Sequence, residues 1–123
     1  MTDEIEKEIQ AKGLTAPRVT PTDLQANIAS AYYFTASDGV QANPADNYSA
    51  VLCGVERDLS LLTFCVLVLK NGFTVTGESA CASPENFDAE IGKKIARQNA
   101  EQKIWPLMGY ELKQRLAQSG AGQ

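Results

Sequence analysis

The segment LTFCVLVLKNGFTVTGESA, from Leu62 to Ala80, constrains the fold of this chain more than any other stretch. A continuous apolar run leads to an Asn71-Gly72 pair, and Val then alternates with Thr. Asn-Gly suits the positive φ angles of a two-residue type I′ turn, and the flanking residues are typical of β-strands. The segment therefore predicts an antiparallel β-hairpin.

A two-residue turn also predicts which residues share each face of the hairpin. The pairs expected on the first face are Lys70–Phe73, Val68–Val75, Val66–Gly77 and Phe64–Ser79. That face is apolar and should pack on a helix, whereas the face with Leu67 and Leu69 is apolar on one strand only. An isolated hairpin is barely stable, so we expect cover from a third strand at Ala50–Val55 or from a second copy of the chain.

A long helix is predicted after the hairpin. In SPENFD, Ser83 caps the helix and Pro84 takes its first position, so the helix runs to about Trp105. Pro106 should break it, leaving a short final helix over Tyr110–Gln118. One side carries Phe87, Ile91, Ile95 and Trp105. The opposite side carries Ala89, Gly92, Ala96 and Ala100, where another backbone could come close.

The N-terminal third predicts two helices followed by a loop. Thr2–Lys12 forms a short amphipathic helix that Gly13 ends. TPTD at Thr20–Asp23 is a capping box, with Pro21 preset for the first turn, and predicts a helix from Pro21 to about Tyr33. The polar stretch Thr35–Asn47 is rich in Gly, Pro, Asn and Asp and is typical of a loop.

A length of 123 residues fits one compact domain. We expect N-terminal helices over 1–34, a loop-rich segment over 35–58, and the hairpin plus helices over 59–118. The predicted fold class is α+β: an antiparallel β-hairpin or small sheet packed on a long helix, with short N- and C-terminal helices.

The residue types exclude most catalytic chemistry. The chain has no histidine, so Ser-His and Cys-His nucleophile pairs are absent. Cys53, Cys65 and Cys81 lack metal-ligand spacing and are expected to be reduced, buried small hydrophobes. We expect no enzyme activity, no cofactor and no metal site.

Charge and hydropathy limit the partners. The net charge of −4 disfavours general nucleic-acid binding. The longest uncharged apolar run, Leu59–Leu69, is far short of the roughly 20 residues that a membrane helix needs. The acidic, amphipathic N-terminus is unlike a signal peptide, which predicts a cytoplasmic protein.

A local positive patch is the main candidate for ligand binding. Its basic residues are Lys93, Lys94, Arg97, Lys103, Lys113 and Arg115. Such a patch in an acidic protein suits a phosphate-bearing small molecule or an acidic partner, and Arg97 could bind phosphate with two parallel hydrogen bonds. The alternative is a solvated helix face on which Glu90 pairs with Lys94 and Arg97 with Glu101. The predicted ligand-binding residues are Asn86, Lys93, Arg97, Lys103, Trp105 and Arg57.

Two segments resemble a known family. AKGLTAPRVTP at Ala11–Pro21 and the run from LTFCVLVLKNGFTVTGESA to WPLMGYELKQRL at Leu62–Leu116 are similar to small tailed-phage proteins founded on gene products of phages N-four and Sf-six. The resemblance implies a phage-encoded accessory protein made in the host bacterial cytoplasm, and implies no established activity. The hairpin-then-helix layout also resembles the Thoeris anti-defence one sponge proteins. Those are oligomers that bind cyclic ADP-ribose-like or cyclic oligonucleotide signals without cleaving them.

The resulting hypothesis is a non-catalytic counter-defence sponge that sequesters such a signal, of the anti-Thoeris or anti-CBASS type. We expect it to act as a homo-oligomer, a dimer or a higher assembly such as a hexamer. Two alternatives stay open. One is a protein–protein inhibitor of a host factor, and the other is a DNA-associated phage accessory protein, which would show steeply salt-dependent binding.

Overall fold

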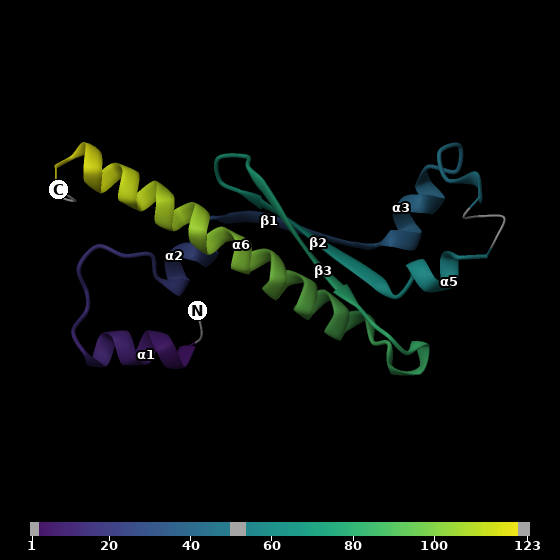
Figure 1. Ribbon diagram of the computed structural model, residues 1–123, viewed down its shortest axis with the longest axis horizontal. Helices are drawn as coiled ribbons and strands as arrows, with labels where there is room; N and C mark the ends of the chain where they lie inside the picture. Colours follow the sequence, from purple (N-terminus) through teal and green to yellow (C-terminus); the bar gives the residue numbers. More distant parts are fainter. Residues whose placement is uncertain (1–2, 50–53, 121–123) are drawn as a thin grey trace.

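The computed structural model describes residues 3–49 and 54–120 (Figure 1). The elements, in chain order, are α1 (Asp3–Ala11), α2 (Pro21–Ala26), β1 (Ile28–Thr35), α3 (Ala36–Ala42), α5 (Glu56–Leu59), β2 (Leu62–Leu69), β3 (Thr74–Ala80), η1 (Pro84–Asn86) and α6 (Ala89–Gln118).

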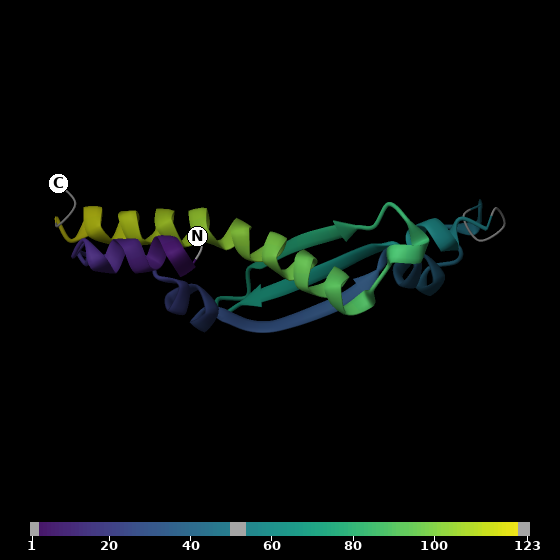
Figure 2. The same cartoon turned by 90° about the horizontal axis from the view of Figure 1, so that it is seen from below.

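A three-stranded antiparallel sheet in the order β1-β2-β3 packs one face against α6. Figure 2 shows α6 running across one face of the sheet, in front of the strands. The predicted α+β class, a small sheet on a long helix with short N-terminal helices, is confirmed.

The β2–β3 hairpin is confirmed, but the predicted register was wrong by one residue. Val68 pairs with Thr74 and Leu67 with Val75. The Leu69 N–H donates to Phe73 O at 2.8 Å, which leaves the three residues 70–72 in the loop. Within this loop only Gly72, at φ 89°, has a positive φ. This is the geometry of a type I turn closed by a left-handed glycine.

The shift of one residue in the register reverses the faces of β2, because successive side chains of a strand point to opposite sides. The buried side chains of β2 are Thr63, Cys65, Leu67 and Leu69, whereas Phe64, Val66 and Val68 face the uncovered side. Leu67 and Leu69 therefore lie under α6 and need no second copy to cover them.

The predicted close approach of α6 to another backbone is present at Gly77. A Cβ at this position would overlap the Ala96 carbonyl oxygen and the Ala100 amide nitrogen. The buried core consists of Leu24, Cys65, Leu67, Leu69, Val75, Ala96, Ala100 and Ile104. The opposite side of α6 is not a second core, since Ile91 and Ile95 are 56% and 43% exposed.

The third strand comes from a segment that was predicted to be helical. The capping box Thr20–Asp23 is present, with both hydrogen bonds formed, but α2 ends at Ala26. Ile28–Thr35 is instead β1, paired with β2 from Ile28↔Leu69 to Thr35↔Thr63. Pairing with an exposed apolar strand outweighed the helical spacing of Leu24 and Ile28, and the run IASAYYFT has the aromatic content typical of strands.

The middle of the chain is more helical than predicted. Thr35 and Asp38 form a second capping box, so α3 occupies part of the expected loop. The strand predicted at Ala50–Val55 lies mostly on residues 50–53, which are outside the described residues. The burial predicted for Cys53 lies outside them as well. The third strand is β1.

Two C-terminal helices were predicted, but the structure has a single helix, α6. Asp88, not Ser83, caps α6, and its Oδ1 accepts from the Glu90 and Ile91 amides at 2.9 and 3.1 Å. Pro84 begins only a 3₁₀ turn. Pro106 lies within α6, and Figure 2 shows the helix bending near its middle rather than ending. A proline removes one backbone hydrogen bond, which neighbouring turns tolerate at an exposed position.

The α1 helix lies apart from the sheet. It has no buried residue, and Gly13, at φ 69°, follows it as predicted. Among the described residues, no helix is long and apolar enough to cross a membrane.

Candidate functional site

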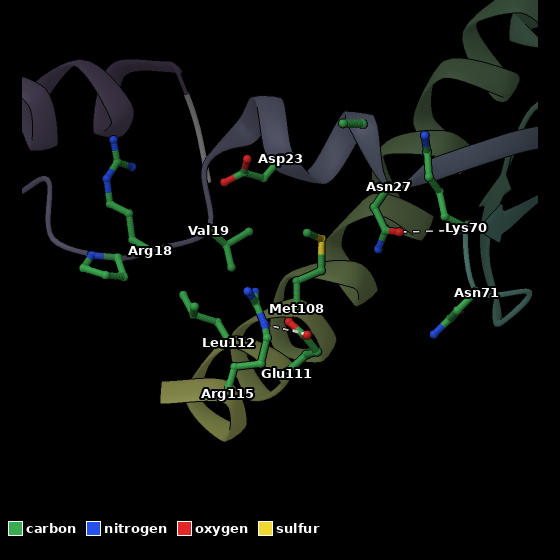
Figure 3. Close-up of a pocket in the computed structure, with 12 residues that line it drawn as sticks. Arg18, Val19, Asp23, Asn27, Lys70, Asn71, Met108, Glu111, Leu112 and Arg115 are labelled. Carbon is green, nitrogen blue, oxygen red and sulfur yellow. Dashed lines mark hydrogen bonds and ion pairs between the residues drawn. The ribbon is translucent and has the colours of Figure 1, made fainter. Parts of the chain in front are cut away.

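A groove with a volume of about 890 Å³ lies among the described residues (Figure 3). It lies where the segment before β1, the β2–β3 loop and the C-terminal half of α6 meet. Its lining residues are Pro17, Arg18, Val19, Asp23, Ala26, Asn27, Lys70, Asn71, Met108, Glu111, Leu112 and Arg115. This volume lies within the roughly 300–1,000 Å³ of typical small-molecule sites.

Three local features shape the groove. The Thr20–Asp23 capping box fixes the start of α2, and the Lys70 N–H bonds Asn27 O at 3.0 Å, tying the hairpin loop to the end of α2. α6 continues through Pro106 and past the sheet, which carries Met108 and Leu112 to the groove. The site therefore depends on the loop geometry and on the continuous α6, neither of which was predicted.

Arg18 marks one rim of the groove and is already engaged. Its guanidinium makes two parallel bonds to the Glu6 carboxylate, at 2.6 and 2.8 Å, and in Figure 3 it points toward α1. The Arg18 hydrogen bonds, with a further one from Gln10, lower the pKa of Glu6 to about 2. This pair ties α1 to the segment before α2.

The other cations of the groove are more available. Lys70 has no ion pair among the described residues. Arg115 pairs with Glu111 at 2.7 Å, but both side chains are at least 60% exposed, and such a pair is weak in water. Figure 3 shows Arg115 and Asn71 pointing toward the middle of the groove from opposite sides.

Two amides add directional hydrogen-bond donors. Asn27 Oδ1 accepts from the Lys70 amide at 3.4 Å, and Asn71 Oδ1 accepts from the Phe73 amide at 2.9 Å. Both Nδ2 groups are left without a partner among the described residues. Together with the apolar surface of Met108 and Leu112, these groups could hold an acceptor-rich ligand that has a flat apolar part.

The six predicted ligand-binding residues do not converge in one described cavity. Arg97 lies on the β1 side of α6, where it bonds Glu101 at 2.9 Å, Gln25 at 3.3 Å and the Tyr33 hydroxyl at 3.5 Å. These bonds raise the pKa of the guanidinium, the Tyr33 bond most. Arg97 thus joins α2, β1 and α6, which is a structural role.

Lys93 and Lys103 occupy other parts of α6. Lys93 pairs with Glu90 at 3.6 Å, the place predicted for Lys94. Lys103 lies on the β3 side, with Nζ 3.5 Å from Thr76 Oγ1. The positive patch is therefore divided between the two sides of one helix.

The remaining three residues are dispersed along the molecule. Trp105 is half-buried and packs against the core. Asn86 lines a smaller cleft of about 140 Å³ with Phe87 and Ile91. Arg57 lies in α5, at the opposite end of the sheet from the groove (Figure 1).

The groove residues were missed because they are far apart in sequence. Arg18, Asn27, Lys70 and Arg115 come from four segments, and no short motif joins them. The sequence predicts only a turn at Asn71-Gly72, whereas in the structure the Asn71 Nδ2 group also has no partner among the described residues.

Cysteine and metal chemistry find no support in the described residues. Cys65 is fully buried, and that burial raises the pKa of its thiol. Cys81 is only partly buried, so the prediction of a buried side chain is wrong there, and its Sγ donates to Ser83 O at 3.2 Å. No group of three or more potential metal ligands occurs in residues 3–49 and 54–120.

Residues 19–116 match the model of the phage protein (N4 Gp49/phage Sf6 gene 66) family. The chain belongs to this family. The match covers both the sheet and α6, so the first resemblance is confirmed and extends over β1 and α3 as well. No curated protein and no solved structure matches the chain.

Proposed function

We propose that this member of the phage protein family is a non-catalytic counter-defence sponge that sequesters a cyclic ADP-ribose-like or cyclic oligonucleotide immune signal. It acts as a homo-oligomer in the cytoplasm of the infected bacterium. The observation that carries the proposal is the groove of about 890 Å³, with Lys70, Arg115 and two asparagine amides on its walls.

The chemistry of the groove suits a phosphate-bearing nucleotide. Phosphates are recognised by Arg and Lys, and base edges by amide donors. Asn27 and Asn71 supply Nδ2 donors, and Met108 and Leu112 supply apolar contact for a base or ribose face. Sequestration needs affinity alone: a dissociation constant of about 10 nM corresponds to about 11 kcal/mol.

Calorimetry on the full chain tests the proposal. The probes are cyclic ADP-ribose, cyclic di-AMP, cyclic di-GMP and a cyclic trinucleotide. Binding of at least one probe, with the probe recovered intact after heating, is the expected result. Consumption of a probe, or no binding by any of them, would reject the sponge.

Matched lysine variants locate the site. Lys70→Gln should weaken probe binding about tenfold, a loss of about 1.4 kcal/mol that is typical of one hydrogen bond to a charged group. Lys93→Gln removes the same charge from α6, away from the groove, and should leave affinity unchanged. The opposite result would move the site from the groove to the part of α6 around Lys93.

A second candidate function is a protein–protein inhibitor of a host factor. The uncovered sheet face favours it, because Tyr32 and Phe34 are 56% and 41% exposed and Phe34 stacks on Phe64 at 5.6 Å between ring centres. Exposed aromatic side chains are typical anchors of protein interfaces. A protein that binds no probe but forms a stable complex with a host protein through this face would establish the inhibitor.

A further inference from the structure

The β1 strand is an open edge of the sheet. β2 pairs with one side of β1, and no other strand of residues 3–49 and 54–120 pairs with its second side. Alternate residues of an edge strand point their N–H and C=O groups away from the neighbouring strand. From Ala29 to Phe34, these outward groups bond no other described residue. β1 is therefore ready to accept a further strand.

Nothing in β1 protects this edge from another strand. Natural edge strands are usually kept apart by charge, proline, shortness or a covering element. β1 is eight residues long, and its sequence IASAYYFT has neither a charge nor a proline. Its one irregularity lies at the start, between Ile28 and Ser30.

The opposite edge, β3, is protected. Asn99 of α6 donates to the Glu78 carbonyl at 2.7 Å, which occupies a backbone acceptor of β3. Lys103 reaches over Thr76, and Glu78 adds a charge. The two edges of one small sheet are thus treated differently, and only β1 is left open.

We propose that β1 is the docking surface for β1 of a second copy, paired antiparallel about a two-fold axis to give one continuous sheet with three strands from each copy. This strand contact would form the homo-oligomer of the proposed function, and it rests only on the oligomeric part of that function. It requires no ligand.

A second copy suits this edge because two β1 strands, which carry no charged residue, bring no like charges together. On the helix side, the nearby charge of Arg97 is already paired with Glu101. On the uncovered side, Tyr32 and Phe34 would extend the Phe34–Phe64 stack into an aromatic band across the axis. An antiparallel two-fold contact would place both α6 helices on the same side of the joined sheet.

Two substitutions in one row of the sheet test the contact. Tyr32 and Thr76 both pair with Val66, one on each edge, and both are exposed on the same face. Tyr32→Glu adds charge to the β1 edge, and in a two-fold dimer it brings like charges together. Thr76→Glu adds the same charge to β3, where Lys103 can pair with it. The mass of the full chain is measured by light scattering and sedimentation, and deuterium uptake is measured over 28–35.

The wild type should be dimeric or larger, with slow deuterium uptake in β1. Tyr32→Glu should weaken self-association about tenfold or more and speed that uptake, whereas Thr76→Glu should change neither. Circular dichroism must show both variants folded, and Ala29→Lys, at another exposed β1 position, gives an independent second disruption.

Every other pattern overturns the proposal. A monomeric wild type shows an open edge that does not pair. Loss of assembly in both glutamate variants assigns the contact to the sheet face, and loss in Thr76→Glu alone assigns it to β3. These measurements use no ligand. The strand contact can therefore be tested even if no probe binds, and probe binding can be tested even if β1 does not pair.

Discussion

Gly77 decides how closely α6 can approach the sheet. Its position in β3 has no room for a Cβ, because the Ala96 and Ala100 backbone lies directly above it. Small residues on both elements let the two backbones meet, and the core side chains Leu67 and Ile104 are fully buried as a result.

Gly77→Ala should therefore destabilise the protein by about 3 kcal/mol, at the upper end of overpacking costs. The measurement is urea unfolding followed by circular dichroism. Gly109→Ala is the matched control, since a Cβ there meets nothing within 4 Å and the site is inside α6. It should stabilise by about 0.5–1 kcal/mol. Equal effects at the two sites would contradict the packing described for Gly77.

The Glu6–Arg18 pair gives α1 a pH dependence. The pKa of Glu6 is lowered from 4.5 to about 2, first by the Arg18 hydrogen bonds. A lowered folded-state pKa contributes stability that is full above pH 4.5 and is lost as the pH falls toward 2. A carboxyl NMR titration should find this low pKa, and Arg18→Gln should return it toward 4.5. An ordinary pKa for Glu6 in the wild type would show that the pair does not hold α1 in solution.

Among the elements, α6 departs most from the sequence-based prediction, because one helix stands where two were expected. A proline in a helical pattern usually ends the helix, yet α6 continues for three turns beyond Pro106. The continuation is what gives the groove its Met108, Leu112 and Arg115 wall.

Pro106→Ala should raise the free energy of unfolding by about 1–3 kcal/mol. The alanine N–H restores the backbone hydrogen bond to Gln102 O, and the steric clash between the proline ring and that carbonyl is removed. Thermal unfolding measures the change. Gln102→Ala, one turn earlier and also exposed, should shift stability by no more than about 0.5 kcal/mol. Lower stability in Pro106→Ala would mean that the bend itself supports the native packing.

At the scale of the whole molecule, charge separates the proposed sponge from a DNA-associated protein. With a net charge of −4 and its cations divided between two sides of α6, the chain should show no binding to a DNA duplex below about 100 μM protein at physiological salt. Fluorescence anisotropy at several salt concentrations is the measurement. Tight, steeply salt-dependent binding that is lost on replacing Lys93, Lys94 and Arg97 would instead support the DNA-associated alternative.

The sequence by itself determined the features that depend on neighbours along the chain. The Asn71-Gly72 hairpin, the Thr20–Asp23 capping box, Gly13 after α1 and the small-residue side of α6 all follow from local conformational preference and helical spacing. Each is confirmed because no distant contact was needed to choose it.

Only the tertiary structure decided the rest. Whether Ile28–Thr35 is helix or strand depends on the free edge of β2, which no local window contains. A shift of one residue in the hairpin reversed the faces of β2, because local sequence fits both turn types while burial under α6 fits only one. The groove likewise exists only where four separate segments meet. Its charged side chains and amides lie far apart in the sequence, and only folding brings them to one cavity.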